Sequence, residues 1–467
     1  MRIVSSFLAT ALLATTVSLV ACTDREVARV DPRQNKEQEK EIPVEVNRDL
    51  DILFVIDNSN SMRDEQISLA ANFGNFINVL NNIEGGLPNI HIGVATTDLG
   101  AGPYNITGCT GNGDNGVLQN AAVGPAGCST PTDKWISDIG DEMGNRTKNY
   151  AGGLSEAFSC IAQLGTNGCG FEQPLESMLL ALKDTSGQNV GFLRPDAFLA
   201  VIIITDEDDC SAKDPSIFNS DPSLDNINSA VGFLSSFRCF EFGVTCDPDS
   251  PRSAGPRQDC VAKEGSPFMH DVSRYVDFLR GLKDDPSKII VAGIRGPGNN
   301  VSVSLSGEAP NQEPKLAPSC CRGPGECNIG TMEKADPAVR IDSFLASFPM
   351  RNTATSICND NLADALTVIA ELLAEVIGNP CIGGDLELDA DGQPDCTVAD
   401  VTKLNQDGQS ESVMAVCNAG RTNVPCYHFD VDTENCSSVP TQLALVIERG
   451  SSNPPPDTTV VARCVSK

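Results

Sequence analysis

The chain has 467 residues, and its 33 basic and 63 acidic side chains give a formal net charge of −30. A chain of this charge repels nucleic acid and anionic lipid surfaces, which excludes nucleic acid as a partner. The charge does not identify the true partner, because most of these carboxylates are expected to face water.

The first 22 residues have the features of a secretory signal. Arg2 supplies a positive start, and residues 7–20 form an apolar core that is too short to span a membrane. The segment ends in Leu-Val-Ala-Cys22, which resembles the bacterial lipobox, where the cysteine thiol receives acyl chains. An ordinary signal peptide with a chance cysteine is the alternative. We expect a lipid anchor at Cys22 as the only membrane attachment, in the bacterial cell envelope and at the outer rather than the inner membrane.

Residues 23–46 are rich in Glu, Lys, Gln, Arg and Pro, and such a segment cannot bury enough apolar surface to fold alone. We predict a polar tether there. Lipidation of Cys22 would leave 18 of the 19 cysteines, an even number that predicts up to nine disulfides in an oxidising compartment. Structural zinc is the less favoured alternative, because the sequence indicates secretion and has no compact pair of Cys-x-x-Cys motifs, and because none of His91, His270 and His428 sits in a metal-ligand cluster.

An apolar run at residues 52–56 predicts a strand buried on both faces of a parallel sheet. It ends in Asp57-Asn58-Ser59-Asn60-Ser61, which places one carboxylate and two hydroxyls at the carboxyl end of the strand. Ligands bind at that end in open α/β sheets. Hard oxygen donors on one short loop suit Mg²⁺, Mn²⁺ or Ca²⁺.

Helical and strand patterns alternate after this loop, which predicts an α/β domain. Apolar residues recur at helical spacing over 62–80, 158–164, 175–182, 272–282, 341–348 and 361–378, and further strands are expected at 90–97, 198–204 and 288–294. The loop 104–126 is expected to be closed by Cys109 and Cys128, and the loop after 164 by Cys160 and Cys169. Segments near 210–270 and 296–335 are predicted to be disulfide-rich insertions.

The strand at 198–204 also ends in Thr205-Asp206, a second carboxylate at a strand end. Together with Asp57-x-Ser59-x-Ser61, this resembles the von Willebrand factor type A family and its metal-ion-dependent adhesion site, over about residues 47–380. The resemblance implies a doubly wound, mainly parallel, Rossmann-like sheet with helices on both faces. It also implies a divalent ion, Mg²⁺ first and Mn²⁺ or Ca²⁺ as alternatives, held by Asp57, Ser59, Ser61 and Asp206. A protein partner would complete the ion's coordination with an acidic side chain.

The chain departs from this family at Glu172, which stands just before the predicted helix at 175–182, where the family has a metal-binding threonine. Two interpretations stay open. In the first interpretation, Glu172 is a metal ligand, which would give the site three negative charges and disfavour the binding of a partner's carboxylate. Alternatively, it is an acid at a helix N-terminus, stabilised there by the helix dipole. Asp98 and Thr166 are further candidates for accessory positions.

Residues 381–467 contain six cysteines and three strand-like segments, which predicts a small disulfide-rich β module. Cys358 and Cys381 flank the helix predicted at 361–378, whose ends would lie about 27 Å apart. A disulfide requires Cα atoms within about 7 Å, so these two cysteines are expected to pair elsewhere, Cys381 within the β module.

The motifs of common hydrolases, kinases and zinc enzymes are not recognised in the chain. The leading hypothesis is therefore a cell-envelope lipoprotein, not an enzyme, whose type A domain mediates metal-dependent protein binding or adhesion. A structural scaffold with a loop-fixing ion is one alternative. A metal-dependent hydrolase that uses the acidic run 206–209 is another, and a deep pocket beside that run would favour it.

Overall fold

The computed structural model describes residues 37–43 and 48–465, except for gaps at 84–85, 122–127, 142–143, 185, 284–285, 323–326, 328–333, 350, 378–380, 385, 390–391, 403, 405–407, 432–435, 437–440 and 450–457. The predicted signal segment and Cys22 lie outside these residues. Within the described part, no helix has both the length and the apolar character needed to cross a membrane.

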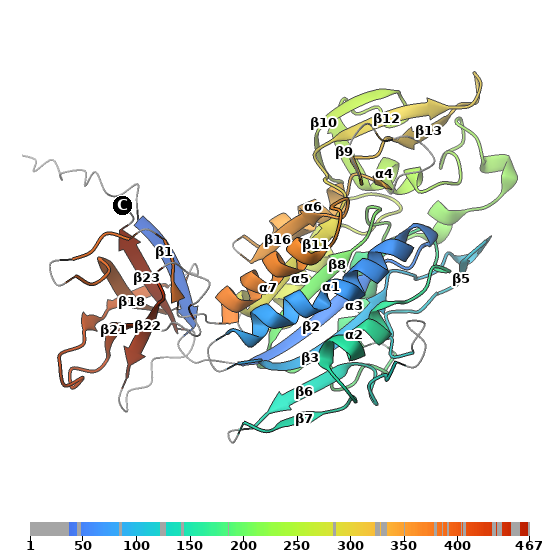
Figure 1. The fold of residues 1–467 in the computed structure, drawn as a ribbon. Coiled ribbons are helices and arrows are strands. Elements are labelled where there is room, and N and C mark those ends of the chain that lie inside the picture. Colours follow the sequence, from blue (N-terminus) through green and yellow to red (C-terminus); the bar gives the residue numbers. More distant parts are fainter. Residues whose placement is uncertain are drawn as a thin grey trace, which may run out of the picture.

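A seven-stranded, mostly parallel sheet forms the centre of the protein (Figure 1). Its strands in spatial order are β16 (Asn352–Ser356), β11 (Ile289–Arg295), β8 (Phe198–Ile204), β2 (Asp49–Ile56), β3 (Asn89–Thr96), β6 (Ile136–Gly140) and β7 (Arg146–Lys148). The first five run parallel, whereas β6 and β7 are antiparallel to their neighbours. This confirms the mixed α/β class.

Side chains that alternate along β2 enter two separate cores, because successive residues of a strand point to opposite faces. Phe54 and Ile56 pack in one core with helices α1 (Arg63–Asn81), α2 (Leu154–Ala162) and α7 (Ala363–Ile377). Leu53 and Val55 pack in the other core with helices α3 (Pro174–Lys183), α5 (Val272–Arg280) and α6 (Val339–Ala346). Burial from both sides explains why β2 and β8 read as continuous apolar runs.

The two insertions form one structure. Strands β9 (Val244–Asp247) and β10 (Gly255–Ala262) of the first pair with β12 (Val301–Ser306) and β13 (Glu313–Leu316) of the second in a single four-stranded sheet. The first insertion also contains α4 (Phe237–Gly243), and a short pair, β14 (Cys320–Cys321) and β15 (Lys334–Ala335), closes the second. The sequence predicted the two segments but not their pairing, which joins residues far apart in the chain.

The carboxyl-terminal module consists of two four-stranded sheets. One has the order β1 (Glu37–Pro43), β23 (Thr458–Val465), β18 (Cys396–Thr402) and β19 (Ser410–Val413). The other has the order β17 (Cys381–Ile382), β22 (Leu443–Glu448), β21 (Cys426–Val431) and β20 (Ala415–Val416). Part of the predicted tether is thus a strand: β1 pairs antiparallel with β23 along its whole length. Main-chain pairing at a sheet edge does not require apolar composition, so the polar sequence gave no sign of it.

The 18 cysteines after Cys22 form nine disulfides. Two expected pairings are wrong, because Cys109 bonds Cys169 and Cys128 bonds Cys160. The loop 104–126 instead contains a hairpin of β4 (Gly102–Ile106) and β5 (Cys109–Gly111). The separation of Cys358 and Cys381 is confirmed, since they bond Cys320 and Cys436 respectively.

Helix α1 offers a test of the packing. Leu69 is fully buried in the core, whereas Ile67 on the same helix is 51% exposed. Leu69→Ala is expected to lower the free energy of unfolding by about 2–5 kcal/mol, because it leaves a cavity. Ile67→Ala, the matched control, should change it by less than about 0.5–1 kcal/mol. Urea denaturation followed by circular dichroism measures both, and equal losses would contradict the placement of α1.

Candidate metal site

The carboxyl ends of β2, β3 and β8 bring the candidate residues together. Strands β2 and β8 pair in register up to Ile56 and Ile204, so the residues that follow them emerge side by side. The main-chain N–H of Asp57 donates to the carbonyl of Ile204 at 2.9 Å. Asp57 is fully buried and Asp206 is only 9% exposed, whereas Ser61 is exposed.

Asp57 organises the first loop. One carboxylate oxygen, Oδ1, accepts the N–H of Ser59 at 2.7 Å, and the other, Oδ2, accepts the hydroxyl of Thr205 at 2.8 Å. The hydroxyls of Ser59 and Ser61 lie 3.1 Å apart. Three of the five residues predicted as ligands, Asp57, Ser59 and Ser61, are therefore joined by hydrogen bonds, and Asp206 lies close enough to Asp57 and Ser61 for both to influence its pKa.

Glu172, the fifth, faces the same cluster from the segment before α3. Its side chain is fully buried, and the hydroxyl of Thr97 at the end of β3 donates to its Oε2. The main chain is held on both sides, since the carbonyl of Glu172 accepts the N–H of Cys210 at 2.6 Å and the N–H of Gln173 donates to Thr97 at 3.1 Å. These contacts fix the direction of the carboxylate.

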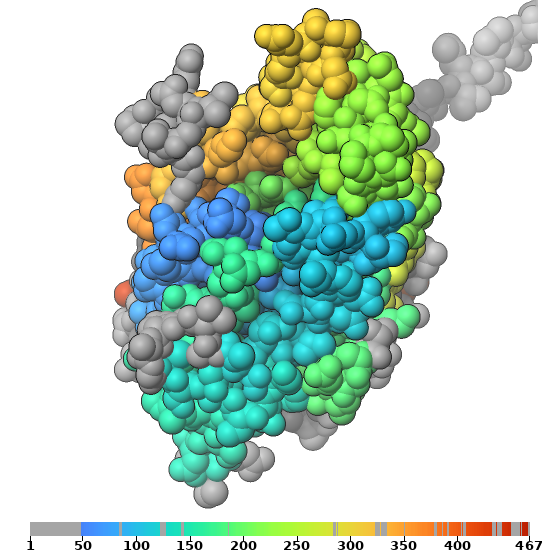
Figure 2. Space-filling view, turned by 90° about the vertical axis from the view of Figure 1, so that its right-hand side faces the viewer, coloured from blue at the N-terminus to red at the C-terminus, as the bar shows by residue number. Residues whose placement is uncertain are grey.

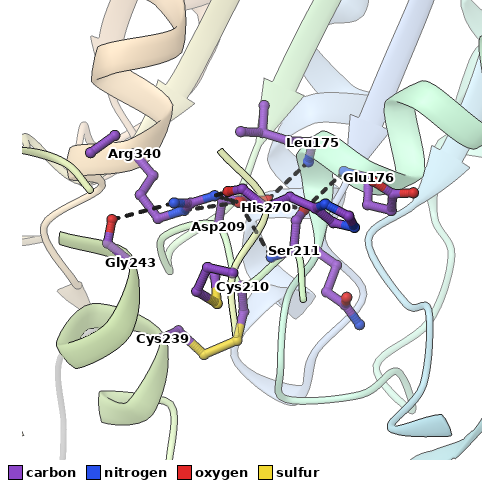
Figure 3. A network of polar contacts seen from close by, with 12 residues as sticks. Leu175, Glu176, Asp209, Cys210, Ser211, Cys239, Gly243, His270 and Arg340 are labelled. Carbon is purple, nitrogen blue, oxygen red and sulfur yellow. Dashed lines mark hydrogen bonds and ion pairs between the residues drawn. A yellow bond between two sulfur atoms is a disulfide. The ribbon is translucent and has the colours of Figure 1, made fainter. Parts of the chain in front are cut away.

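Residues other than Glu172 accept hydrogen bonds from the first N–H groups of α3 (Figure 3). Asp209 accepts the N–H of Leu175 at 3.0 Å, and the hydroxyl of Ser211 accepts the N–H of Glu176 at 2.9 Å. Glu172 precedes the helix cap and hydrogen-bonds Thr97 instead. Asp209 and Ser211 thus accept the first N–H groups of α3, and Glu172 lies just outside the helix.

The site concentrates negative charge in a buried place. Burial raises the pKa of Glu172 well above its usual range, and the Asp57, Glu207 and Asp206 carboxylates raise it further. Burial and then Asp57 raise the pKa of Asp206 well above its usual range. The pKa of Asp57 is raised by burial, against the hydrogen bonds from Ser59 and Thr205. Each of these carboxyl groups is therefore costly to ionise without a compensating positive charge.

Within the part of the chain that the structure describes, three buried oxygens on the loops of the site have no hydrogen-bond partner: Asn58 Oδ1, Glu172 Oε1 and Asp206 Oδ1. Unsatisfied buried acceptors beside like charges, with hydroxyls between them, form an all-oxygen donor set that fits a hard divalent cation. Among the described residues, no three Asp, Glu, His or Cys side chains converge closely enough to hold a metal by themselves. A metal at this place would therefore need the serine hydroxyls as donors as well.

The two accessory candidates lie near the site. The carboxylate of Asp98 accepts the N–H of Gly100 at 2.8 Å and so stabilises the turn after β3. Thr166 lies on the segment between α2 and α3 that leads to Glu172. Figure 2 shows this end of the molecule, where the two insertions stand beside the segment near residue 60 and border a hollow.

Sequence reasoning missed several positioning residues. The hydroxyls of Thr97 and Thr205 donate to the carboxylates of Glu172 and Asp57 respectively. Each is a threonine that directly precedes an aspartate at a strand end, a pattern that the sequence shows. Arg340 is different: its guanidinium is fully buried and lies 3.0 Å from Asp209, and it also donates to the carbonyls of Gly243 and His270. Nothing in the local sequence marks an arginine of α6 as the partner of this loop (Figure 3).

Comparison with known proteins gives only distant similarity. No protein-family model and no curated protein matches the chain. Among solved structures, it is similar to the pilus adhesin SpaC from Lactobacillus rhamnosus GG in its open conformation, with 12% identity, a TM-score of 0.30, and coverage of 93% of this chain and 43% of that one. The pilus adhesin RrgA from Streptococcus pneumoniae gives 12% identity and a TM-score of 0.29, covering 91% and 57%. A von Willebrand factor type A protein from Catenulispora acidiphila gives 10% identity and a TM-score of 0.27, covering 92% and 65%.

The chain thus spans between 43% and 65% of the length of these three structures. TM-scores below 0.5 carry no conclusion about function, so the function has to be inferred from the residues of the site.

The buried acids predict a pH dependence. Burial raises the pKa of Asp336 to about 6 from an ordinary value of 3.8, against the opposing effect of Lys334. Between those two values the folded protein binds a proton that the unfolded chain has lost, so its free energy of unfolding falls as the pH rises. Asp336→Asn should remove this loss and gain stability relative to the wild type, by about 1–3 kcal/mol at neutral pH.

The measurement is urea denaturation in a chelator at several pH values across that window. The exposed acid Asp64 supplies the control variant, Asp64→Asn, which should follow the wild type. A constant difference between Asp336→Asn and the wild type at every pH would contradict the burial of this carboxyl group.

Proposed function

We propose that this protein is a lipid-anchored protein of the bacterial cell envelope, in which a doubly wound, type A-like domain binds a protein partner through a divalent cation. The observation that carries the proposal is the set Asp57, Ser59, Ser61 and Asp206 at the carboxyl end of the central sheet, of which the first three are joined by hydrogen bonds. Within the described residues, the buried Asp206 Oδ1 has no hydrogen-bond partner, and the outermost member, Ser61, is exposed.

Each residue has a distinct part in this proposal. Asp57 and Asp206 supply negative charge on the buried side of the site, and the hydroxyl of Thr205 donates to Asp57 and orients it. Ser59 and Ser61 supply neutral hydroxyls on the outer side. Mg²⁺ is the expected cation, with Mn²⁺ or Ca²⁺ as alternatives, and when bound it would offer a coordination position to a group of the partner. The hollow beside the insertions is where the partner would approach (Figure 2).

A structural scaffold is the second candidate function, since Asp57 and Glu172 are fully buried and held by hydrogen bonds. An ion would then only fix the loops. A pull-down from envelope extracts with Mg²⁺ and with chelator separates the two functions, because partner capture that survives chelation favours the scaffold. The hydrolase alternative gains no support from the cavity of about 810 Å³ beside β6, β7 and α2, because that cavity lies at the amino end of the parallel strands.

Asp57→Ala is expected to abolish binding of Mg²⁺ or Mn²⁺, because it removes the carboxylate that organises the loop and contributes charge. Asp64→Ala replaces an exposed acid on the first turn of α1 and is the control. Isothermal titration calorimetry measures affinity, and circular dichroism checks that both variants are folded. Wild-type affinity in folded Asp57→Ala would show that the ion binds elsewhere.

Cys22→Ala is expected to release the protein from membranes, because the thiol that would carry the acyl chains is lost. The protein should move to the soluble fraction when cells are fractionated. A second substitution, Cys320→Ser, removes a disulfide cysteine but not the proposed anchor and controls for general damage. Full retention of Cys22→Ala in membranes would refute the anchor.

A further inference from the structure

We infer that Glu172 adds a third negative charge to a site whose two aspartates already neutralise the bound divalent ion, so that the partner contributes a neutral oxygen and not a carboxylate. The partner group would be an amide, a hydroxyl or a main-chain carbonyl. This inference rests on the proposed function and concerns the chemistry of the partner at the same site.

The first step is that Glu172 belongs to the ion's surroundings. Its carboxylate is fully buried, and Oε1 has no hydrogen-bond partner among the described residues, whereas Oε2 accepts from Thr97. An unpartnered oxygen in such a place is rare in folded proteins and marks a position for a ligand. The helix that follows does not use this carboxylate, because Asp209 and Ser211 satisfy its first N–H groups.

The second step is the charge balance. Asp57 and Asp206 together neutralise a divalent ion, and Glu172 makes the loaded site negative by one unit. Interaction between charges is strong in a buried site, so this holds whether Glu172 touches the ion directly or through a water molecule. A carboxylate from a partner would add a second excess negative charge, which is costly where the groups are out of water.

The third step is the geometry of approach. The carboxylates of Asp57, Glu172 and Asp206 are buried, and the exposed side of the loop is formed by hydroxyl-bearing Ser61. A partner therefore meets an ion that already has its negative ligands on the inner side. Neutral oxygens complete such a shell without adding charge, as amide and carbonyl oxygens do in Ca²⁺ sites.

The experiment uses the full chain in detergent and Mn²⁺ as the probe, because unbound Mn²⁺ is counted directly by electron paramagnetic resonance. Mn²⁺ affinity is measured with and without sodium acetate at constant ionic strength, acetate serving as a free carboxylate. The variant is Glu172→Gln, which keeps the shape and an acceptor for Thr97 but removes the charge. Glu176→Gln, four residues later and bonded to Arg274 and Tyr275 outside the site, is the matched control.

For the wild type and Glu176→Gln, we expect acetate to leave Mn²⁺ affinity unchanged. For Glu172→Gln, Mn²⁺ affinity without acetate should fall by about tenfold or more, because one charge is lost. Acetate should then strengthen Mn²⁺ binding, since two ligands that bind together raise each other's affinity equally.

Acetate that strengthens Mn²⁺ binding to the wild type would overturn the inference and leave the proposed function intact. Equal Mn²⁺ affinity in the wild type and folded Glu172→Gln would do the same. Absence of Mn²⁺ binding by the wild type would overturn the proposed function and this inference with it. The wild-type response to acetate needs no variant, so the test stands even if Glu172→Gln does not fold.

Discussion

The burial of several carboxyl groups at one end of a parallel sheet is the constraint on which the rest of the structure depends. Strands β2 and β8 lie next to each other in register, so the acids that follow them, Asp57 and Asp206, must lie close together. The hydroxyls of Thr205 and Thr97 donate to Asp57 and to Glu172 respectively. Donors of this kind reduce the cost of buried like charges but do not remove it, and this remaining cost supports the proposed cation.

The acidic run after β8 shows how neighbouring residues of the same type take different tasks. Asp206 faces the candidate site, whereas the Asp208 carboxylate accepts the N–H groups of Arg340 and Ile341 at the start of α6, and its pKa is raised to about 7 by burial. Asp209 accepts from α3 and pairs with Arg340 in the interior.

This run also ties the site to the insertion. Arg340 donates to the carbonyls of Gly243 and His270, and the disulfide between Cys210 and Cys239 closes the same region (Figure 3). Both side chains of the Asp209–Arg340 pair are fully buried, so removal of either would leave an uncompensated charge in the interior. The insertion is thereby held against the loop that carries Asp206.

The parts of the structure that could be predicted from sequence are those in which local pattern and tertiary demand agree. The strands β2 and β8, the helices α1 and α7, and the meeting of Asp57 with Asp206 follow from apolar runs and from the rule that parallel strands end at one edge. The short strands β6, β7 and β16 at and near the edges of the sheet carry few apolar residues, so no periodic signal marks them.

Features that depend on contacts between distant segments were out of reach. The disulfides of Cys109 and Cys128 join other cysteines than their sequence neighbours, because α2 and the segment before α3 fold back on the preceding loops. The pairing of β1 with β23 and the burial of Arg340 against Asp209 have the same origin. For Glu172 the sequence left two roles open, and it gave no sign that Asp209 and Ser211 accept the first N–H groups of α3.

The pairing of β1 with β23 places the amino-terminal strand at one end of the molecule. The amino-terminal strand lies in the carboxyl-terminal module, at the end of the central sheet where β2 begins, and the loop from Asp57 to Ser61 lies at the other end (Figure 1). With the proposed anchor at Cys22, a short segment separates the membrane from β1. The module would then stand nearest the membrane, and the exposed edge of the candidate site would face away from it.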